Sequence, residues 1–350
     1  MDRFVFFIIL ISRPISLQSI SCDNIEWNVT HESNHNKRGI YQTKNKVFAV
    51  YNCSHIIKTD KERIEILKGK QIVMIGDSVQ RNLYTNLAHF IHTKDWYSIK
   101  PHIEYRVDFH TWENYYKSSN QRFGCYEYCD CCELENAWNG KTPATVEIKA
   151  NRYYYNPHYN IKLNYHFNKG LCLPIPFIIQ GSFFDTQSTS ILESDRCNKP
   201  STIYCHKNNN EHEISLSLLT FAQTYLYNYK PDIIIINQGF WDYCNYYKLN
   251  ITLMSELFIT LNNTLTHNGH LIWRGTTRYL GESKNNNNYL IELKMLENIG
   301  YKIFDAYKYT MNLPYDAYEP GNKHHLAPSV CEELNKRLID MIYTLTMQKS

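Results

Sequence analysis

A run of four isoleucines at 233–236, preceded by Pro231-Asp232 and followed by Asn237, constrains the fold of this chain more than any other segment. β-Branched residues favour strands, and this run shows no alternation of apolar and polar side chains. Both faces of such a strand are expected to be buried, as in the centre of a parallel sheet that helices cover on both sides. The segment therefore predicts an α/β protein.

Strand-like runs and helical patterns alternate along much of the chain. The expected strands are residues 71–75, 176–181, 231–237, 270–276 and 301–306, and the expected helices are residues 80–91, 215–229, 252–266, 289–298 and 328–346. This alternation predicts right-handed βαβ units and a three-layer α/β/α architecture with a parallel five-stranded sheet. Open sheets of this kind tend to adopt the flavodoxin-like strand order 2-1-3-4-5, which makes the first and third strands neighbours.

Two segments stand outside this alternation. Residues 22–60 are expected to form an N-terminal extension, and residues 92–170 a Cys/Tyr-rich insertion in a domain that spans residues 61–347. The insertion contains the string Arg-Tyr-Tyr-Tyr-Asn at 152–156, whose tyrosines either line a carbohydrate groove or pack half-buried. Packing is the simpler interpretation because the chain has 29 tyrosines.

Four cysteines gather within this insertion, at positions 125, 129, 131 and 132. The C-x-x-C pair formed by 129 and 132 suggests a zinc or redox site. Zinc would require a second such pair at regular spacing, and a thioredoxin-like pair should open a helix after a strand. The surrounding sequence has neither feature, which favours an insertion held together by disulfides.

The first 21 residues have the three parts of a signal peptide, namely Arg3, the apolar run 4–11 and the small residues at 19–21. The apolar run is too short to span a bilayer, and the alternative is a buried first strand. The 11 cysteines suit an oxidising compartment. The chain also carries four N-glycosylation sequons, at Asn28, Asn52, Asn250 and Asn262. We therefore expect a secreted or lumenal protein whose mature chain has no integral membrane segment.

The charge balance and the motif content exclude several classes of function. The chain has 37 Lys and Arg residues against 34 Asp and Glu residues, and a net charge of +3 does not predict a nucleic-acid partner. Neither the H-E-x-x-H zinc motif nor a glycine-rich phosphate loop occurs, so no metal and no other cofactor is expected. The oligomeric state is left open.

The first expected strand ends in Gly76-Asp77-Ser78, directly before the first helix. This position puts the Ser78 hydroxyl at the positive end of a helix dipole, close to backbone N–H groups. An acyl-transfer nucleophile needs such a place, because negative charge develops there in the transition state. The alternative is a helix N-cap serine, which is common.

Two further residues are candidate donors of an oxyanion hole. Asn237 ends the third expected strand, which is predicted to lie beside the first, so its amide should lie near Ser78. Gly181 ends the second expected strand on the other side of the first. It could offer a backbone N–H group or could be a simple turn glycine.

The loop before the last helix supplies a base for the serine. It reads Gly-Asn-Lys-His-His-Leu-Ala-Pro over residues 321–328 and follows the fifth expected strand, so it opens at the same edge of the sheet. A histidine in this loop can reach Ser78 and accept its proton.

These motifs together resemble the PC-esterase family of SGNH/GDSL-type hydrolases. The likeness is carried by G-D-S-x-x-R-N at 76–82, by Ile-Ile-Asn at 235–237 with Trp-Asp at 241–242, and by His-x-x-Pro at 325–328. It covers about residues 65–345 and is nearest to the animal PC-esterase domain-containing proteins. The resemblance implies an SGNH hydrolase fold.

The same resemblance implies a function and the roles of three residues. Ser78 would be the nucleophile, Asn237 the oxyanion donor and His325 the base of an acyl esterase or O-acyltransferase. The expected substrate is an acylated small molecule or a glycan, such as an O-acetylated one. Hydrolysis and transfer are not distinguished, because water and a sugar hydroxyl attack the same acyl-enzyme.

One position departs from the family pattern. The family has Asp-x-x-His, and the matching residue here is Asn322, which holds geometry but supplies no charge to an imidazolium. Asp316 and Glu319 lie close upstream and could substitute for the missing aspartate. The alternatives are therefore an SGNH-fold module that has lost activity and binds a glycan or protein, and a disulfide-rich structural protein.

Overall fold

The computed structural model describes residues 26–31, 46–50, 53–94, 96, 152–168, 175–180, 206–208, 211–237, 251–279, 287–318 and 324–348. Several predictions fall outside these ranges. They are the signal peptide at 1–21, the cysteine cluster at 125–132, Gly181, Glu319 and Asn322.

A six-stranded sheet forms the centre of the molecule, with strand order β11-β10-β9-β3-β5-β4. Its strands are β3 (Gln71–Gly76), β4 (Arg152–Asn156), β5 (Ile161–Phe167), β9 (Ile233–Ile236), β10 (His270–Arg274) and β11 (Lys302–Phe304). All neighbouring pairs are parallel except β4 and β5. The predicted α/β class is confirmed. The prediction of a five-stranded, fully parallel sheet is wrong, because β4 adds an antiparallel edge strand.

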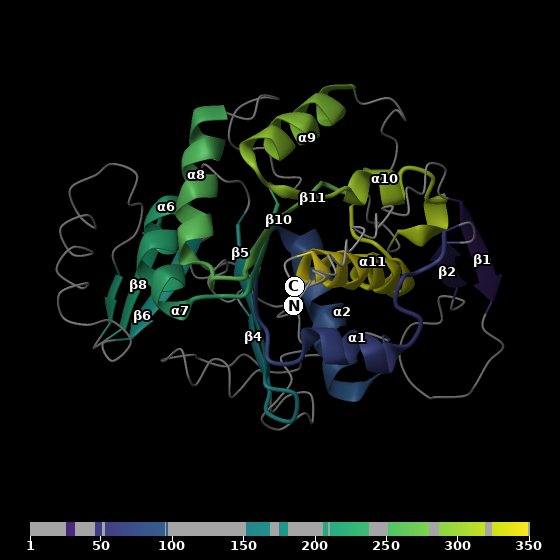
Figure 1. The fold of residues 1–350 in the computed structure, drawn as a ribbon, viewed down its shortest axis with the longest axis horizontal. Coiled ribbons are helices and arrows are strands. Elements are labelled where there is room, and N and C mark those ends of the chain that lie inside the picture. Colours follow the sequence, from purple (N-terminus) through teal and green to yellow (C-terminus); the bar gives the residue numbers. More distant parts are fainter. Residues whose placement is uncertain are drawn as a thin grey trace, which may run out of the picture.

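Helices cover the two faces of this sheet (Figure 1). One face carries α1 (Asp60–Leu67), α2 (Ser78–Thr93) and α11 (Pro328–Met347). The other carries α6 (Leu218–Phe221), the π-helix η2 (Ala222–Leu226), α7 (Tyr227–Tyr229), α8 (Ile251–Thr264) and α9 (Asn287–Ile299). Two short helices, α10 (Ala306–Thr310) and the 3-10 helix η3 (Tyr315–Ala317), follow β11.

The four isoleucines of β9 show how the sequence builds these layers. Ile233 and Ile235 pack into the core beneath α2 and α11, whereas Ile234 and Ile236 pack into the core beneath α8. All four are at most 1% exposed, so the prediction of burial on both faces is confirmed.

The second predicted strand is not in this sheet. β6 (Ile175–Gln180) instead pairs antiparallel with β8 (Glu211–Leu216), which also pairs with β7 (His206–Asn208) in a separate sheet. The place beside β3 belongs to β5, so residues 92–170 are not all an insertion. With β5 counted as second, the parallel strands follow the order 2-1-3-4-5. Because β8 extends to Leu216, the helix predicted at 215–229 begins only at Leu218.

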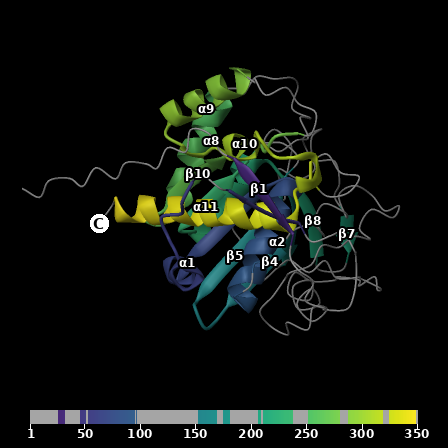
Figure 2. The same ribbon diagram turned by 90° about the vertical axis from the view of Figure 1, so that its right-hand side faces the viewer.

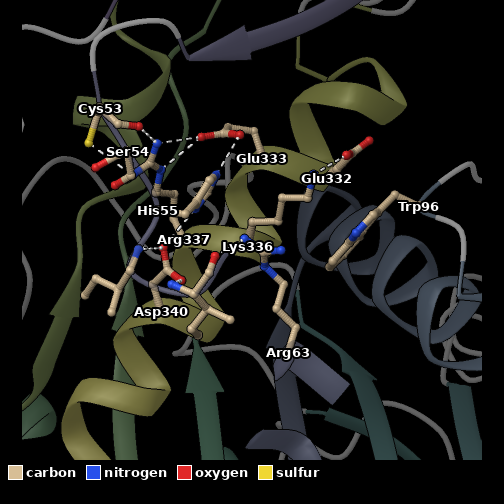
Figure 3. Close-up of polar contacts among 12 residues, drawn as sticks. Cys53, Ser54, His55, Arg63, Trp96, Glu332, Glu333, Lys336, Arg337 and Asp340 are labelled. Carbon is tan, nitrogen blue, oxygen red and sulfur yellow. Dashed lines mark hydrogen bonds and ion pairs between the residues drawn. The ribbon is translucent and has the colours of Figure 1, made fainter. Parts of the chain in front are cut away.

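The N-terminal extension forms a two-stranded antiparallel sheet of β1 (Trp27–His31) and β2 (Lys46–Val50). β2 lies next to α11 (Figure 1), and Figure 2 shows α11 along its length with α1 and α2 beside it. After β2, residues 53–57 lie against α11 and are bound to it by polar contacts (Figure 3). Within the described ranges, no helix has the length and apolar character needed to cross a membrane.

Candidate active site

The turn between β3 and α2 holds Ser78. Asp77 is the N-cap of α2, and its Oδ1 accepts hydrogen bonds from the backbone N–H groups of Val79 (3.1 Å) and Gln80 (3.3 Å). Ser78 is therefore the first helical residue and not the cap, so the alternative of an N-cap serine is wrong. Its hydroxyl lies at the positive end of the helix dipole.

His325 reaches this hydroxyl from the loop before α11. Its Nε2 atom lies 2.8 Å from Ser78 Oγ. A His325 tautomer protonated at Nδ1 can accept the serine proton at Nε2. The neighbouring His324 instead packs against the ring of Tyr279, with a distance of 4.5 Å between ring centroids. The two adjacent histidines thus have different partners, and only His325 contacts Ser78.

Asn237 follows β9 and lies against the backbone that leads to Ser78. Its N–H group donates to Ile75 O (3.0 Å), and its side chain is fully buried. A Cβ atom on Gly76 would come within 1.9 Å of Asn237 Oδ1, so only glycine allows this approach. The structure thus brings Ser78, His325 and Asn237 to one edge of the sheet.

Strand β5 holds the same turn from the other side. The Tyr165 hydroxyl is within donating distance of Gly76 O (2.9 Å) and Asp77 O (2.7 Å), and Asn168 N–H donates to Gly76 O (2.8 Å). Both residues are buried. Sequence reasoning missed them because it assigned their segment to an insertion. The alternation Ile-x-Leu-x-Tyr-x-Phe over residues 161–167 was the signal that could have identified the strand.

Gln80 and Arg274 form a second arrangement that the sequence analysis did not single out. Arg274 ends β10 and donates from Nε to Gln80 Oε1. Both side chains are buried, and burial lowers the pKa of Arg274 while the nearby Asp77 opposes that shift. The sequence signal that could have identified Arg274 is its position as a charged residue at the end of an otherwise apolar strand.

The other sequence-derived candidates are Asp316, Gly181, Glu319 and Asn322. Asp316 is exposed in η3, and Gly181, Glu319 and Asn322 lie outside the described residues. Among the residues that the structure describes, no group of three or more His, Cys, Asp and Glu side chains could hold a metal ion.

A serine hydroxyl at a helix N-terminus, bonded to an imidazole and close to a buried amide, is an arrangement that supports nucleophilic acyl transfer. The turn that carries the serine is fixed by the Asp77 cap within α2 and by hydrogen bonds from Tyr165 of β5 and from Asn168, which follows β5. Such a fixed geometry favours catalysis because little reorganisation is needed during reaction. No protein-family model matches this chain, and no curated protein matches it either.

Proposed function

We propose that this protein is a serine-dependent acyl esterase or O-acyltransferase that works through an acyl-enzyme on Ser78. The observation that carries the proposal is the 2.8 Å contact between His325 Nε2 and Ser78 Oγ, two residues 247 positions apart in the chain. The location of Ser78 at the start of α2 supports the same chemistry.

In the proposed reaction, His325 Nε2 accepts the Ser78 proton while Oγ attacks the carbonyl carbon of the ester. The negative charge on the carbonyl oxygen is stabilised by the N-terminus of α2 and by Asn237. The tetrahedral intermediate then expels the alcohol, which takes its proton from His325. Water or a second hydroxyl attacks the acyl-enzyme with His325 again as base, and Ser78 is regenerated.

We further propose that the chain has a flavodoxin-like SGNH fold of the PC-esterase type. The order of its five parallel strands supports this assignment, as does the G-D-S-x-x-R-N motif at the start of α2. The expected substrates are acylated small molecules or O-acylated glycans. The sequons and the predicted signal peptide support a secreted or lumenal location.

A fluorophosphonate probe tests the proposal, because it reacts only with an activated serine. We expect the purified wild type to be labelled and Ser78→Ala not to be labelled. His325→Ala should slow labelling by about 10²- to 10⁴-fold, the usual contribution of a general base. His324→Ala is the matched control and should label at close to the wild-type rate, because His324 packs on Tyr279.

A second candidate function is favoured by one residue. Asn322 stands where the resembled family has an aspartate, so it supplies no carboxylate to an imidazolium. A site of this kind would serve as a glycan- or protein-binding surface. Folded wild-type protein that accepts no serine-directed probe, even on long incubation, would favour this binding module over the enzyme.

A further inference from the structure

Three neighbouring strands end in a row beneath the first turn of α2. In the parallel registers, Ile75 of β3 and Trp273 of β10 both lie opposite Ile236 of β9. The next residue of each strand is Gly76, Asn237 and Arg274, respectively. These three residues therefore stand side by side at the carboxyl edge of the sheet.

All three also face the same layer. Met74, Ile235 and Ile272 pack into the core beneath α2 and α11. Side chains two residues apart in a strand point to the same face, so Gly76, Asn237 and Arg274 face α2 as well. Arg274 thus lies on the side of the sheet from which Ser78 emerges.

Gln80 of α2 connects this row to the nucleophile turn. A Cβ atom on Gly76 would lie 2.9 Å from Gln80 Cβ and 1.9 Å from Asn237 Oδ1, so Gln80 and Asn237 crowd the same glycine. The far end of Gln80 accepts the hydrogen bond from Arg274 Nε, while Arg274 Nη1 donates to Gly275 O (3.3 Å). Gln80 is two residues after Ser78, in the same helical turn.

The chemistry of arginine fixes how Gln80 is held. A guanidinium has only hydrogen-bond donors, so Arg274 can bind only the oxygen of the Gln80 amide. The Gln80 NH2 group must therefore point away from Arg274. Arg274 is 1% exposed and Gln80 is fully buried, so water does not compete for this contact. A buried, hydrogen-bonded side chain of this kind strongly limits movement of the helical turn to which it belongs.

The charge of Arg274 also acts on the site. Its strongest favourable charge interaction is with Asp77, the N-cap that precedes Ser78. The Arg274 charge offsets the negative charge of the buried Asp77 carboxylate, which would otherwise oppose the negative charge that develops on the substrate carbonyl oxygen, because interactions in a water-poor interior are weakly screened.

We propose that Arg274 is a positioning residue for acyl transfer: through Gln80 it holds the first turn of α2, and therefore Ser78 Oγ, in register with Asn237, and its charge offsets that of the buried Asp77 carboxylate beside the nucleophile. The inference rests on the proposed function and assigns to the site two residues that neither supply a proton nor form a bond to the substrate.

The test compares Arg274→Met with wild type in kcat and KM for p-nitrophenyl acetate and in the rate of fluorophosphonate labelling. Each rate is divided by the concentration of active sites from burst titration, so unfolded protein does not contribute. We expect Arg274→Met to lower kcat and the labelling rate by about 10-fold or more. This loss should be smaller than the loss of about 10²- to 10³-fold that follows removal of a direct oxyanion donor. KM should change little, because Arg274 does not touch the substrate.

Arg63 provides a matched control. It is also a buried arginine, 3% exposed, and it donates to Asp60 Oδ1 (2.8 Å) and Ile57 O (2.6 Å) at the start of α1. Arg63→Met should destabilise the fold but leave the rate per active site within about 2-fold of wild type, because its partners Asp60 and Ile57 do not belong to the site. Equal slowing in Arg63→Met and Arg274→Met would show a merely structural effect and overturn the inference.

Gln80→Glu covers the case in which Arg274→Met does not fold. A glutamate keeps the acceptor for Arg274 but neutralises its charge, so we expect a slower acylation at near-normal stability. Wild-type rates in both variants overturn the inference while the wild type is still labelled. If Arg274→Met does not fold, Gln80→Leu removes the acceptor that Arg274 holds, and wild-type rates in both Gln80 variants then overturn the inference. Absence of labelling in the wild type overturns the proposed function instead.

Amide hydrogen exchange tests the positioning role without any need for activity. In Arg274→Met, the Val79 and Gln80 amides should exchange faster than in wild type, whereas Arg63→Met should leave them unchanged. Equal protection of these amides in Arg274→Met and wild type overturns the role of Arg274 in holding the turn.

Discussion

The Nδ1 atom of His55 lies 2.8 Å from Asp340 Oδ2, although 285 residues separate them in the chain. His55 Nε2 lies 3.2 Å from Glu333 Oε2, and Asp340 also accepts from the backbone N–H groups of Ile56 and Ile57. Arg337 completes the group by donating to Glu333 and to the Cys53 carbonyl (Figure 3). These contacts attach residues 53–57 to α11, the helix that follows His325.

This attachment should make stability depend on pH. Burial alone lowers the pKa of His55, but its hydrogen bonds to Asp340 and Glu333 outweigh burial and raise the pKa above 6.5. Burial alone raises the pKa of Glu333, but His55 and Arg337 outweigh it and lower the pKa below 4.5. The His55 contribution is complete below pH 6.5 and is lost as pH rises through the raised pKa. The Glu333 contribution is complete above pH 4.5 and is lost as pH falls through the lowered pKa.

We therefore expect the contribution of this group to be largest between pH 4.5 and 6.5. Urea unfolding of wild type and His55→Gln at several pH values measures it. The free energy of unfolding of the wild type should exceed that of the variant most within this window, and the difference should shrink toward alkaline pH. A difference that is constant across pH would contradict the assignment.

Gly76→Ala should damage the site by moving Asn237. The added methyl group would overlap Asn237 Oδ1, so the amide or the strand must shift. We expect a loss of stability of about 1–3 kcal/mol, as in other overpacked cores, together with a large fall in kcat. Adding Asn237→Gly to this variant restores space and should recover part of the stability but not the activity. Full activity in Gly76→Ala would show that Asn237 has no role in the reaction.

Ser78→Ala and Asp77→Ala should separate catalysis from capping. The Ser78 hydroxyl makes one hydrogen bond to His325 and caps nothing, so its loss should change the free energy of unfolding by at most about 1 kcal/mol. Loss of the Asp77 cap should cost about 1–2 kcal/mol. Thermal unfolding compares the two, and greater destabilisation by Ser78→Ala would contradict the assignment of Asp77 as the cap.

Local patterns predicted some elements almost to the residue. The helix expected at 328–346 is α11, Pro328–Met347, because apolar residues recur at steps of three and four and Pro328 fits the first turn. The isoleucine run identified β9 because its composition alone requires burial on both faces. The positions of Ser78 and Asn237 followed from the ends of two such strands.

Pairing between distant segments was not predictable in this way. β5 has apolar side chains on one face and Asn164 and His166 on the other, so it resembles a half-exposed strand, although both polar residues are buried. Burial lowers the pKa of His166 to about 3, so its imidazole is neutral in the core. β6 has the more apolar sequence, yet it pairs elsewhere. The role of Tyr165 depends on the pairing of β5 with β3, which explains why it was missed. The role of Arg274 depends instead on its contact with Gln80 of α2, which a strand pattern does not reveal.

The 11 cysteines give a test of the compartment. An odd number leaves at least one cysteine outside an internal disulfide, and Cys331 in α11 is buried and is not part of a disulfide. We expect protein from an oxidising host to show about one free thiol by mass spectrometry after alkylation in denaturant without reductant. Cys331→Ala should remove it. Alkylation of most of the cysteines would contradict the secretory location.

The final prediction concerns Asn322. During the attack by Ser78, the imidazolium of His325 needs a negative partner, and Asn322 supplies an amide where the resembled family supplies a carboxylate. If no other carboxylate takes this role, the wild type should be slow and Asn322→Asp should raise kcat by up to about 10³- to 10⁴-fold. KM should change less, since the added charge acts on the transition state.

Two controls make the outcome for Asn322 decisive. If Asp316 or Glu319 already serves His325, the wild type will be active, Asn322→Asp will change little, and Asp316→Asn or Glu319→Gln will be the costly variant. Asn322→Asp combined with Ser78→Ala must remain inactive, because any gain has to act through the serine. If neither wild type nor Asn322→Asp turns over an acyl ester or accepts the fluorophosphonate, then Ser78 and His325 form a hydrogen bond that serves structure or binding, and the enzyme hypothesis is wrong.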